Sequence, residues 1–233
     1  MLAAWLKAHL GWVRGSVFVL SALPALYLLA AYLSDSLGAN PLETMTHVSG
    51  RSALILLLLS LAITPLRKWL ATLAQWTSRR YGKRLADWNW LVRLRRQLGL
   101  WCFAYALGHA GVYLEFDIAY DMALLRTDLG EKPYLAVGAL ALLLLWPLAI
   151  TSTPAMMRWL GKHWQTLHRL TYPIAVLVLL HFWWLVKPGA WRPLPETLAL
   201  GILLGYRLLI AVRWLERWPG VDGSESPERP PRN

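Results

Sequence analysis

Three histidines lie within apolar stretches of the chain: His109, His168 and His181. An imidazole in hydrocarbon is unfavourable without a partner, so a histidine inside a membrane segment marks a candidate functional site. His168 and His181 share one apolar segment, and His109 lies in another. Two facing helices of this kind could clamp a flat metal cofactor between their imidazoles.

The composition places the chain among membrane proteins. Of its 233 residues, 57% are hydrophobic and 16% are charged, and the mean hydropathy is +0.39. Soluble domains average roughly 25% charged residues. The net charge of +11 would suit a nucleic-acid binder, but the cations cluster between apolar segments, so we expect no nucleic-acid partner. Cys102 is the only cysteine, which excludes an internal disulfide and a two-cysteine metal or redox motif.

Six segments are long and apolar enough to form bilayer-spanning helices, which need about 20 mostly apolar residues. They are residues 13–33, 49–66, 98–116, 134–150, 167–186 and 198–212. The sequence therefore predicts an all-α integral membrane protein, a six-transmembrane-helix bundle in which residues 1–218 form one domain. Residues 219–233 are polar and rich in proline, so we expect a disordered cytoplasmic tail. The first apolar segment is longer than the h-region of a signal peptide, so we expect no cleavable leader.

Lysine and arginine are distributed unevenly between the two sides of the predicted bundle. The side with both termini carries Lys7, Arg14, Arg67, Lys68, Arg79, Arg80, Lys83, Arg84, Arg93, Arg95, Arg96, Arg158, Lys162, Arg169, Arg207, Arg213 and Arg217. The opposite side carries Arg51, Arg126, Lys132, Lys187 and Arg192, with most of the loop acids. Cytoplasmic loops are enriched in Lys and Arg, so both termini are predicted to be cytoplasmic.

The rise of an α-helix, about 1.5 Å per residue, gives the depth of each histidine. His181 lies about 20 Å beyond His168 along the fifth segment, and His109 lies equally far beyond Arg96 in the third. His109 and His181 should therefore lie at the same depth, toward the external side, and His168 toward the cytoplasmic side. Two neutral imidazoles on facing helices could ligate one haem iron axially.

Plainer explanations exist for the same residues. Gly108, Ala110 and Gly111 strip bulk from the backbone around His109, and small residues in a membrane helix usually allow close helix packing. The same gap would let a porphyrin edge approach. His168 could simply be a wetted interfacial histidine.

The geometry of the fifth segment leaves one question open. An ideal helix places His168 and His181 about 140° apart, and Pro173 between them could kink the helix and change that angle. The remaining histidines, His9, His47 and His163, are expected to contact water or headgroups. A weak repeat, Leu-Ala-Ile-Thr at 61–64 and again at 148–151 with a proline soon after, fits either helix termination by proline or an internal duplication.

Short motifs follow one another in order along nearly the whole chain. They are Ser49-Gly50-Arg51, Ala62-Ile63-Thr64-Pro65-Leu66-Arg67, Arg95-Arg96-Gln97-Leu98-Gly99-Leu100, Ala104-Tyr105 with His109 and Tyr113, Lys132-Pro133-Tyr134, Ala149-Ile150-Thr151-Ser152, Leu160-Gly161-Lys162, and Trp164, Leu167, His168, Leu170 and Tyr172 up to His181. In this order and spacing they resemble the MsrQ family, also called YedZ, of the ferric reductase-like transmembrane superfamily.

The resemblance implies an electron-transfer subunit without catalytic residues of its own. MsrQ proteins are b-haem subunits of the bacterial inner membrane, which take electrons from the quinone pool and pass them to MsrP. MsrP is a periplasmic molybdenum enzyme that reduces methionine sulfoxide in envelope proteins. The resemblance further implies one or two haems b, with His109 and His181 as axial ligands of the iron and His168 as a third essential histidine. A flavin mononucleotide (FMN) is also attributed to the family.

The inner histidine departs from the pattern of superfamily members that stack two haems. Those members carry two histidines on each of the third and fifth helices, whereas here the inner position of the third falls at Arg95 or Arg96. His168 could ligate a second haem with a non-histidine partner, or hydrogen-bond a quinone or flavin. No GxGxxG motif is present, so we expect electrons from quinol or from a separate cytosolic flavin reductase.

Other functions stay open at this stage. The superfamily also reduces metal ions at the external face. A transporter is disfavoured because Glu115 and Glu196 lie near segment ends and no acidic relay crosses the midplane. A passive anchor for a periplasmic enzyme is a further alternative. We expect the partner on the external loops, including residues 117–131, and anionic lipid or a flavin reductase on the basic residues 67–96.

Overall fold

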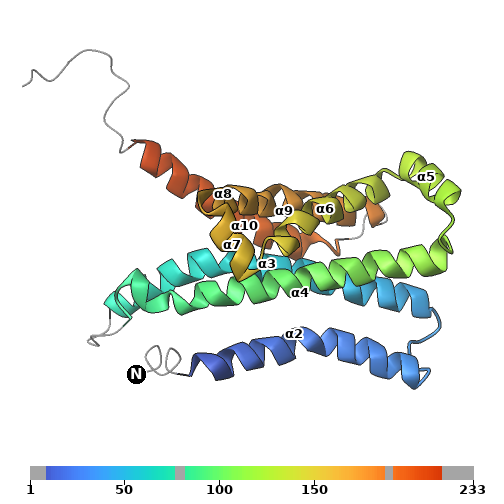
Figure 1. The fold of residues 1–233 in the computed structure, drawn as a ribbon, viewed down its shortest axis with the longest axis horizontal. Coiled ribbons are helices and arrows are strands. Elements are labelled where there is room, and N and C mark those ends of the chain that lie inside the picture. Colours follow the sequence, from blue (N-terminus) through green and yellow to red (C-terminus); the bar gives the residue numbers. More distant parts are fainter. Residues whose placement is uncertain (1–8, 77–81, 187–190, 217–233) are drawn as a thin grey trace, which may run out of the picture.

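The computed structural model describes residues 9–76, 82–186 and 191–216, and within these ranges it contains helices and no strand. The long helices are α2 (Leu10–Leu33), α3 (Pro41–Gln75), α4 (Trp90–Val112), α6 (Pro133–Ile150), α9 (Thr171–Leu185) and α10 (Leu194–Glu216). They form an elongated bundle with α2 along one edge (Figure 1). The all-α prediction is confirmed. The tail predicted at 219–233 lies outside the described residues.

Four of these helices are long and apolar enough to cross a membrane: α2, α3, α6 and α10 over Leu194–Val212. Helices also occupy the other two predicted segments, but α4 carries three arginines near its start and α9 has only 15 residues. A membrane protein is therefore indicated, and the count of six spans stays a prediction.

Helix α3 is much longer than its predicted span. Asn40 caps its start, where the side-chain oxygen accepts a hydrogen bond from the Glu43 N–H (3.2 Å). The helix then continues through Pro65 to Gln75, so termination at this proline is wrong. The second proline of the weak repeat, Pro154, instead begins the short helix α7 (Pro154–Leu160).

The fifth predicted span is not one continuous α-helix. Its inner part consists of α8 (Lys162–Leu167) and a 3₁₀ turn, η3 (His168–Leu170), and α9 begins at Thr171. Pro173 lies in the first turn of α9, where a backbone N–H has no intrahelical partner anyway. His168 and His181 thus share one helical segment, but the 3₁₀ turn between them means that the 140° angle of an ideal α-helix does not apply.

The core lies between two closely packed helix pairs, α3 with α4 and α6 with α9. Its most buried side chains include Leu61 on α3, Cys102 on α4 and Ile174 on α9. Helix α2 buries far fewer side chains. It is tied on by the Tyr105 hydroxyl, which donates to the Ser21 carbonyl (2.6 Å) and accepts from the Ala25 N–H (3.0 Å). The hydroxyl thus joins the hydrogen-bond ladder of α2 beside Pro24.

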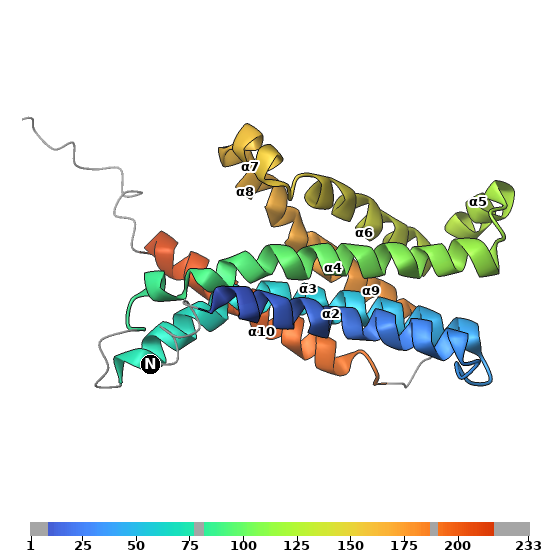
Figure 2. The same ribbon diagram turned by 60° about the horizontal axis from the view of Figure 1, so that its bottom comes forward.

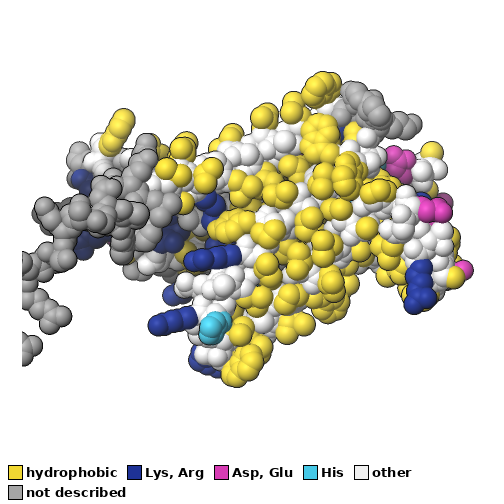
Figure 3. All heavy atoms as spheres, turned by 90° about the horizontal axis from the view of Figure 1, so that it is seen from above, with side chains coloured by type: hydrophobic (Ala, Val, Ile, Leu, Met, Phe, Trp, Pro, Cys, Tyr) yellow, Lys and Arg dark blue, Asp and Glu magenta, His cyan; other side chains and the backbone are white. Residues whose placement is uncertain are grey.

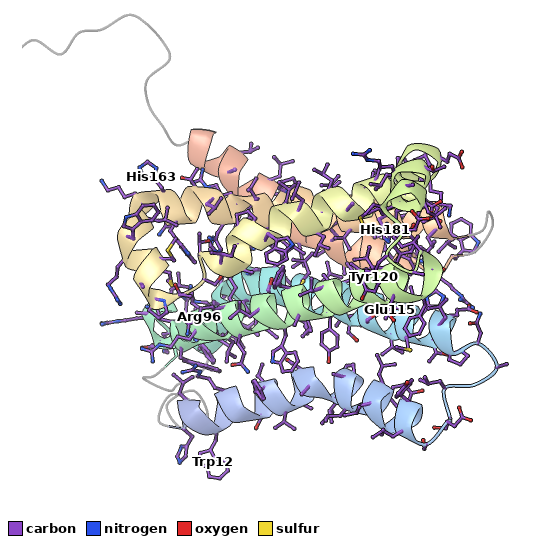
Figure 4. All side chains as sticks on the ribbon, turned by 45° about the vertical axis from the view of Figure 1, so that its right-hand side comes forward. Trp12, Arg96, Glu115, Tyr120, His163 and His181 are labelled. Carbon is purple, nitrogen blue, oxygen red and sulfur yellow. The ribbon has the colours of Figure 1, made fainter. Side chains whose placement is uncertain are left out.

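The two ends of the bundle differ in chemistry. The short helices α7 and α8 lie at one end and α5 (Met122–Glu131) at the other (Figure 2). On the face shown in Figure 3, hydrophobic side chains cover the middle, most Lys and Arg lie toward one end, and the acids lie at the other. Arg96 and His163 belong to the first end, and Glu115, Tyr120 and His181 to the second (Figure 4). We call them the basic end and the acidic end.

Candidate functional site

The structure brings two of the three predicted histidines together near the acidic end. His109 extends from α4 and His181 from α9, with ring centroids 6.1 Å apart and ring planes at 89° to each other. Both side chains are half-buried. These two residues are the outer histidine pair.

Each outer imidazole is held by a backbone carbonyl of a neighbouring helix. His109 Nδ1 lies 3.0 Å from the Thr46 carbonyl oxygen on α3, and His181 Nδ1 lies 2.7 Å from the Tyr134 carbonyl oxygen on α6. A carbonyl oxygen only accepts, so Nδ1 carries the proton in both rings and Nε2 keeps its lone pair. Neither Nε2 has a hydrogen-bond partner within the described part of the chain.

Two glycines make these contacts possible. A Cβ atom added to Gly50 would lie 3.0 Å from His109 Nδ1 and Cε1, and one added to Gly138 would lie 2.7 Å from His181 Nδ1. Real Cβ atoms essentially never approach another heavy atom as closely as 2.7 Å. Each imidazole therefore occupies space that any other residue type would fill.

The outer pair fits a metal bound between two imidazoles. With metal–nitrogen distances of about 2.1 Å, two imidazoles on opposite sides of one ion have ring centroids about 6.4 Å apart. The observed separation is 6.1 Å. Ligating histidines almost always donate their other ring N–H to a carbonyl, carboxylate or water, as both do here. No cluster of three or more His, Cys, Asp or Glu occurs among the described residues, so the donors suit a cofactor that needs only two protein ligands.

His168 lies apart from the outer pair, on η3. Its Nδ1 donates to the Trp164 carbonyl oxygen (3.0 Å), and its Nε2 faces the Ser152 hydroxyl at 3.5 Å. The Trp164 indole stacks on the imidazole with centroids 3.9 Å apart, and its own N–H donates to the Thr151 carbonyl oxygen (2.9 Å). Both ring nitrogens of this histidine thus have polar neighbours.

A half-buried cation near the basic end, Arg207, was missed by the sequence reasoning. The Arg207 guanidinium donates to the Tyr172 hydroxyl and to the Leu61 carbonyl oxygen, and it lies 4.7 Å above the Tyr172 ring. No carboxylate pairs with it among the described residues, and its Nε is buried without a partner. Arg95 is close enough to act electrostatically on both Arg207 and His168. Only the position of Arg207 inside an apolar segment could have signalled it.

The carbonyl partners and the glycines of the outer pair were also missed as functional residues. They follow one pattern, in which the glycine comes four residues after the carbonyl: Thr46 with Gly50, and Tyr134 with Gly138. The spacing is visible in the sequence, but which glycine faces which histidine depends on helix packing.

Comparison with known proteins identifies the family. The model of the ferric reductase like transmembrane component matches residues 49–179. The haem-binding subunit MsrQ of protein-methionine-sulfoxide reductase from Azospira oryzae is 42% identical over 89% of this chain and 83% of its own length. Its counterpart from Herminiimonas arsenicoxydans is 41% identical over 87% and 85%, and that from Bordetella pertussis 40% over 93% and 98%. The chain belongs to the MsrQ family.

The regions that match the family include the residues of the candidate site. The matched region contains both supporting glycines, His109 and His168, and ends two residues before His181. The MsrQ relatives extend across His181 as well, because their alignments cover at least 87% of this chain in the three cases above.

Proposed function

We propose that the protein is the haem-binding electron-transfer subunit of a methionine-sulfoxide reductase system in the bacterial inner membrane. It carries haem b between His109 and His181 and passes electrons from the quinone pool to a periplasmic molybdenum enzyme of the MsrP type. The observation that carries the proposal is the outer histidine pair, with two Nε2 lone pairs unused and both Nδ1–H groups held by carbonyls. The names of the MsrQ relatives support haem and the sulfoxide substrate system.

The residues around the haem have separate tasks in this proposal. His109 and His181 would each hold the haem iron through Nε2, and the carbonyls of Thr46 and Tyr134 hold the two rings in place. Haem, when bound, supplies a one-electron redox change whose potential depends on the axial ligands, their hydrogen bonds and their burial. No side chain of the chain needs to act on the sulfoxide itself.

The proposed topology places this site near the periplasm. We infer six spans with both termini in the cytoplasm, because the basic end then faces the cytoplasm and the acidic end faces the periplasm. The outer pair lies near the acidic end, on the partner's side of the membrane. The external loops, including α5, would then receive MsrP, and the basic residues 67–96 would meet anionic lipid or a flavin reductase.

Electron entry is assigned to the basic end. His168, Ser152 and Arg207 place polar groups there within an otherwise apolar bundle. They suit a quinol headgroup, FMN or a second haem with one histidine ligand, and we propose quinol as the donor. The alternative electron donor is a cytosolic flavin reductase.

One other activity has a specific observation in its favour. The family model is named for ferric reductases, and a haem near the external face could reduce a metal ion there. Transport is less well supported, because the carboxylate Glu196 is buried and ion-paired with Arg51 (3.1 Å) rather than free. Two assays on quinol-treated vesicles separate ferric reduction from electron supply to the sulfoxide reductase. One measures reduction of a ferric chelate, and the other measures reduction of a methionine-sulfoxide protein through the partner enzyme.

Replacement of the outer histidines tests the proposal. His109→Ala and His181→Ala should each abolish the absorption bands of reduced haem b, because a single remaining ligand cannot complete the axial pair. His163→Ala is the matched control, since His163 lies on the exposed surface of α8, and it should retain the bands. Full haem content in both outer variants, or a wild-type protein without haem, would refute the proposal.

A further inference from the structure

The two outer histidines are supported by the same local device on two different helices. In an α-helix the N–H of residue i+4 donates to the carbonyl of residue i, and the side chain at i+4 stands beside that carbonyl. A glycine at i+4 leaves the oxygen accessible from the side, so that the oxygen can accept a bond besides the helical one. At Thr46 the Ser49 hydroxyl also donates to this oxygen (3.2 Å). Thr46 and Gly50 form this arrangement on α3, and Tyr134 and Gly138 form it on α6.

The close approach of an imidazole distinguishes these two glycines from those beside His109. A Cβ atom on Gly108 or Gly111, the glycines that flank His109 on its own helix, would meet nothing within 4 Å. At Gly50 and Gly138 the three atoms nearest to an added Cβ all belong to the imidazole itself. General close packing of helices would bring backbone or aliphatic atoms to these positions instead.

We propose that Gly50 and Gly138 are a matched pair of positioning residues. Each one keeps a helix carbonyl open, so that the opposing histidine holds its proton on Nδ1 and presents an unprotonated Nε2 as a ligand. The part concerning haem rests on the function proposed above. The part concerning the tautomer does not, since the two carbonyl contacts exist without any cofactor.

Gly138→Ala must displace the His181 imidazole from its carbonyl, whereas Gly50→Ala requires the His109 imidazole to shift by a few tenths of an ångström. The effect is larger for Gly138→Ala than for Gly50→Ala, because the added Cβ would lie 2.7 Å rather than 3.0 Å from the ring nitrogen. When a metal-ligating side chain loses the group that accepts its hydrogen bond, metal affinity typically falls about 10- to 100-fold. The reduction potential should also rise, because the carbonyl bond makes the imidazole more basic and so favours the ferric state.

The experiment compares Gly138→Ala and Gly50→Ala with Gly201→Ala in the purified full-length chain; Gly201 is an exposed glycine of α10 whose added Cβ would meet nothing within 4 Å. Haem b is titrated into each protein, the potential of the loaded form is measured, and nitrogen NMR of labelled histidine reports the tautomers in the haem-free form. We expect about 10- to 100-fold weaker haem binding for Gly138→Ala, a smaller loss for Gly50→Ala, and wild-type behaviour for Gly201→Ala. His181 should lose its Nδ1–H tautomer in Gly138→Ala while His109 keeps it.

Two results separate this inference from the proposed function. Wild-type haem binding and unchanged tautomers in both alanine variants would overturn the positioning role and leave the haem proposal intact. A wild-type protein that binds no haem, but whose His181 tautomer changes in Gly138→Ala, would overturn the haem proposal and leave the positioning role intact.

A further variant covers the case in which Gly138→Ala unfolds the protein. The clash involves only the imidazole, so His181→Ala with Gly138→Ala should be as stable as His181→Ala alone. If the double variant is as unstable as Gly138→Ala, the glycine serves helix packing and the inference fails.

Discussion

The outer histidine pair and the inner His168 all donate Nδ1–H to a backbone carbonyl, but they differ in where that carbonyl lies and in what faces Nε2. His109 and His181 donate their Nδ1 protons to carbonyls on other helices, and their Nε2 atoms have no partner among the described residues. His168 donates to the Trp164 carbonyl four residues earlier in the chain, and its Nε2 faces Ser152. Only the outer pair is supported across helix interfaces.

The difference shows what prepares a membrane histidine for ligation. A ligand must be fixed in one tautomer with its lone pair unused, which the two carbonyls and their glycines provide at the outer site. His168 instead stacks against the Trp164 ring, within electrostatic reach of Arg95, and both of its ring nitrogens have polar neighbours. These polar neighbours are the reason for proposing that a quinol headgroup binds here through hydrogen bonds.

The largest difference between the sites should appear when methionine replaces histidine. His181→Met retains an axial ligand but exchanges imidazole for a thioether, which raises the potential of a b-type centre strongly. His168→Met should leave the potential of the outer haem unchanged. Spectroelectrochemical titration of both variants checks this. Equal shifts in the two would mean that the sites are not separate.

His168→Ala should impair electron entry and spare the outer haem. We expect the reduced haem b bands of the outer site to remain, while reduction by a short-chain quinol slows by at least about tenfold, comparable to the loss of an outer-shell partner. Stopped-flow absorption measures the rate, with His163→Ala as the control. Loss of the outer bands in His168→Ala would show that His168 supports the outer site after all.

Trp164→Phe is a milder change at the inner site. Phenylalanine keeps a ring over His168 but loses the indole N–H that donates to the Thr151 carbonyl oxygen. The lost hydrogen bond should cost about 1 kcal/mol of stability, and quinol reduction should slow less than in His168→Ala. Thermal unfolding and the stopped-flow assay check both. A shift of the outer haem spectrum would contradict the separation of the two sites.

The smallest effect is expected at helix α5, at the acidic end. Bonds from the Lys132 ammonium and the Tyr113 hydroxyl hold the pKa of Asp128 below its usual range. Folding therefore favours the ionised form of Asp128. The ionised carboxylate contributes to the free energy of unfolding in full above the usual aspartate pKa, and this contribution is lost as the pH falls through the lowered pKa. Asp128→Asn should mimic that loss at neutral pH.

Hydrogen exchange over residues 122–131 measures this local change. We expect faster exchange in Asp128→Asn and unaltered haem bands, because Tyr113 can still donate to the amide oxygen. Thr127→Ala, on the exposed part of the same helix turn, is the control. Loss of haem in Asp128→Asn would mean that the outer site depends on α5 rather than on the four helices that hold it.

The sequence allowed part of this structure to be predicted because helix rise is nearly constant. Depth arithmetic put His109 and His181 at one level, and the structure places their ring centroids 6.1 Å apart. The apolar segments also gave the helical class. The role of the two histidines as haem ligands stays a prediction.

Other features depend on packing that no local pattern contains. Pro65 does not end α3, because tertiary packing carries the helix on to Gln75. His168 lies on a 3₁₀ turn rather than in α9, so the angle computed for a single helix did not apply. The supporting glycines lie on α3 and α6, whereas the sequence drew attention to those beside His109. Their importance follows from which helices face each other.

The most direct test of the account is the low-temperature electron paramagnetic resonance spectrum of the oxidised protein, recorded beside its His168→Ala and His181→Ala variants. Perpendicular axial imidazoles, like the outer rings at 89°, leave two iron d orbitals nearly equal in energy and so give a strongly anisotropic low-spin signal. We predict this signal in the wild type and in His168→Ala, and its absence in His181→Ala. A signal that disappears in His168→Ala and survives in His181→Ala would contradict the assignment of the haem to the outer pair.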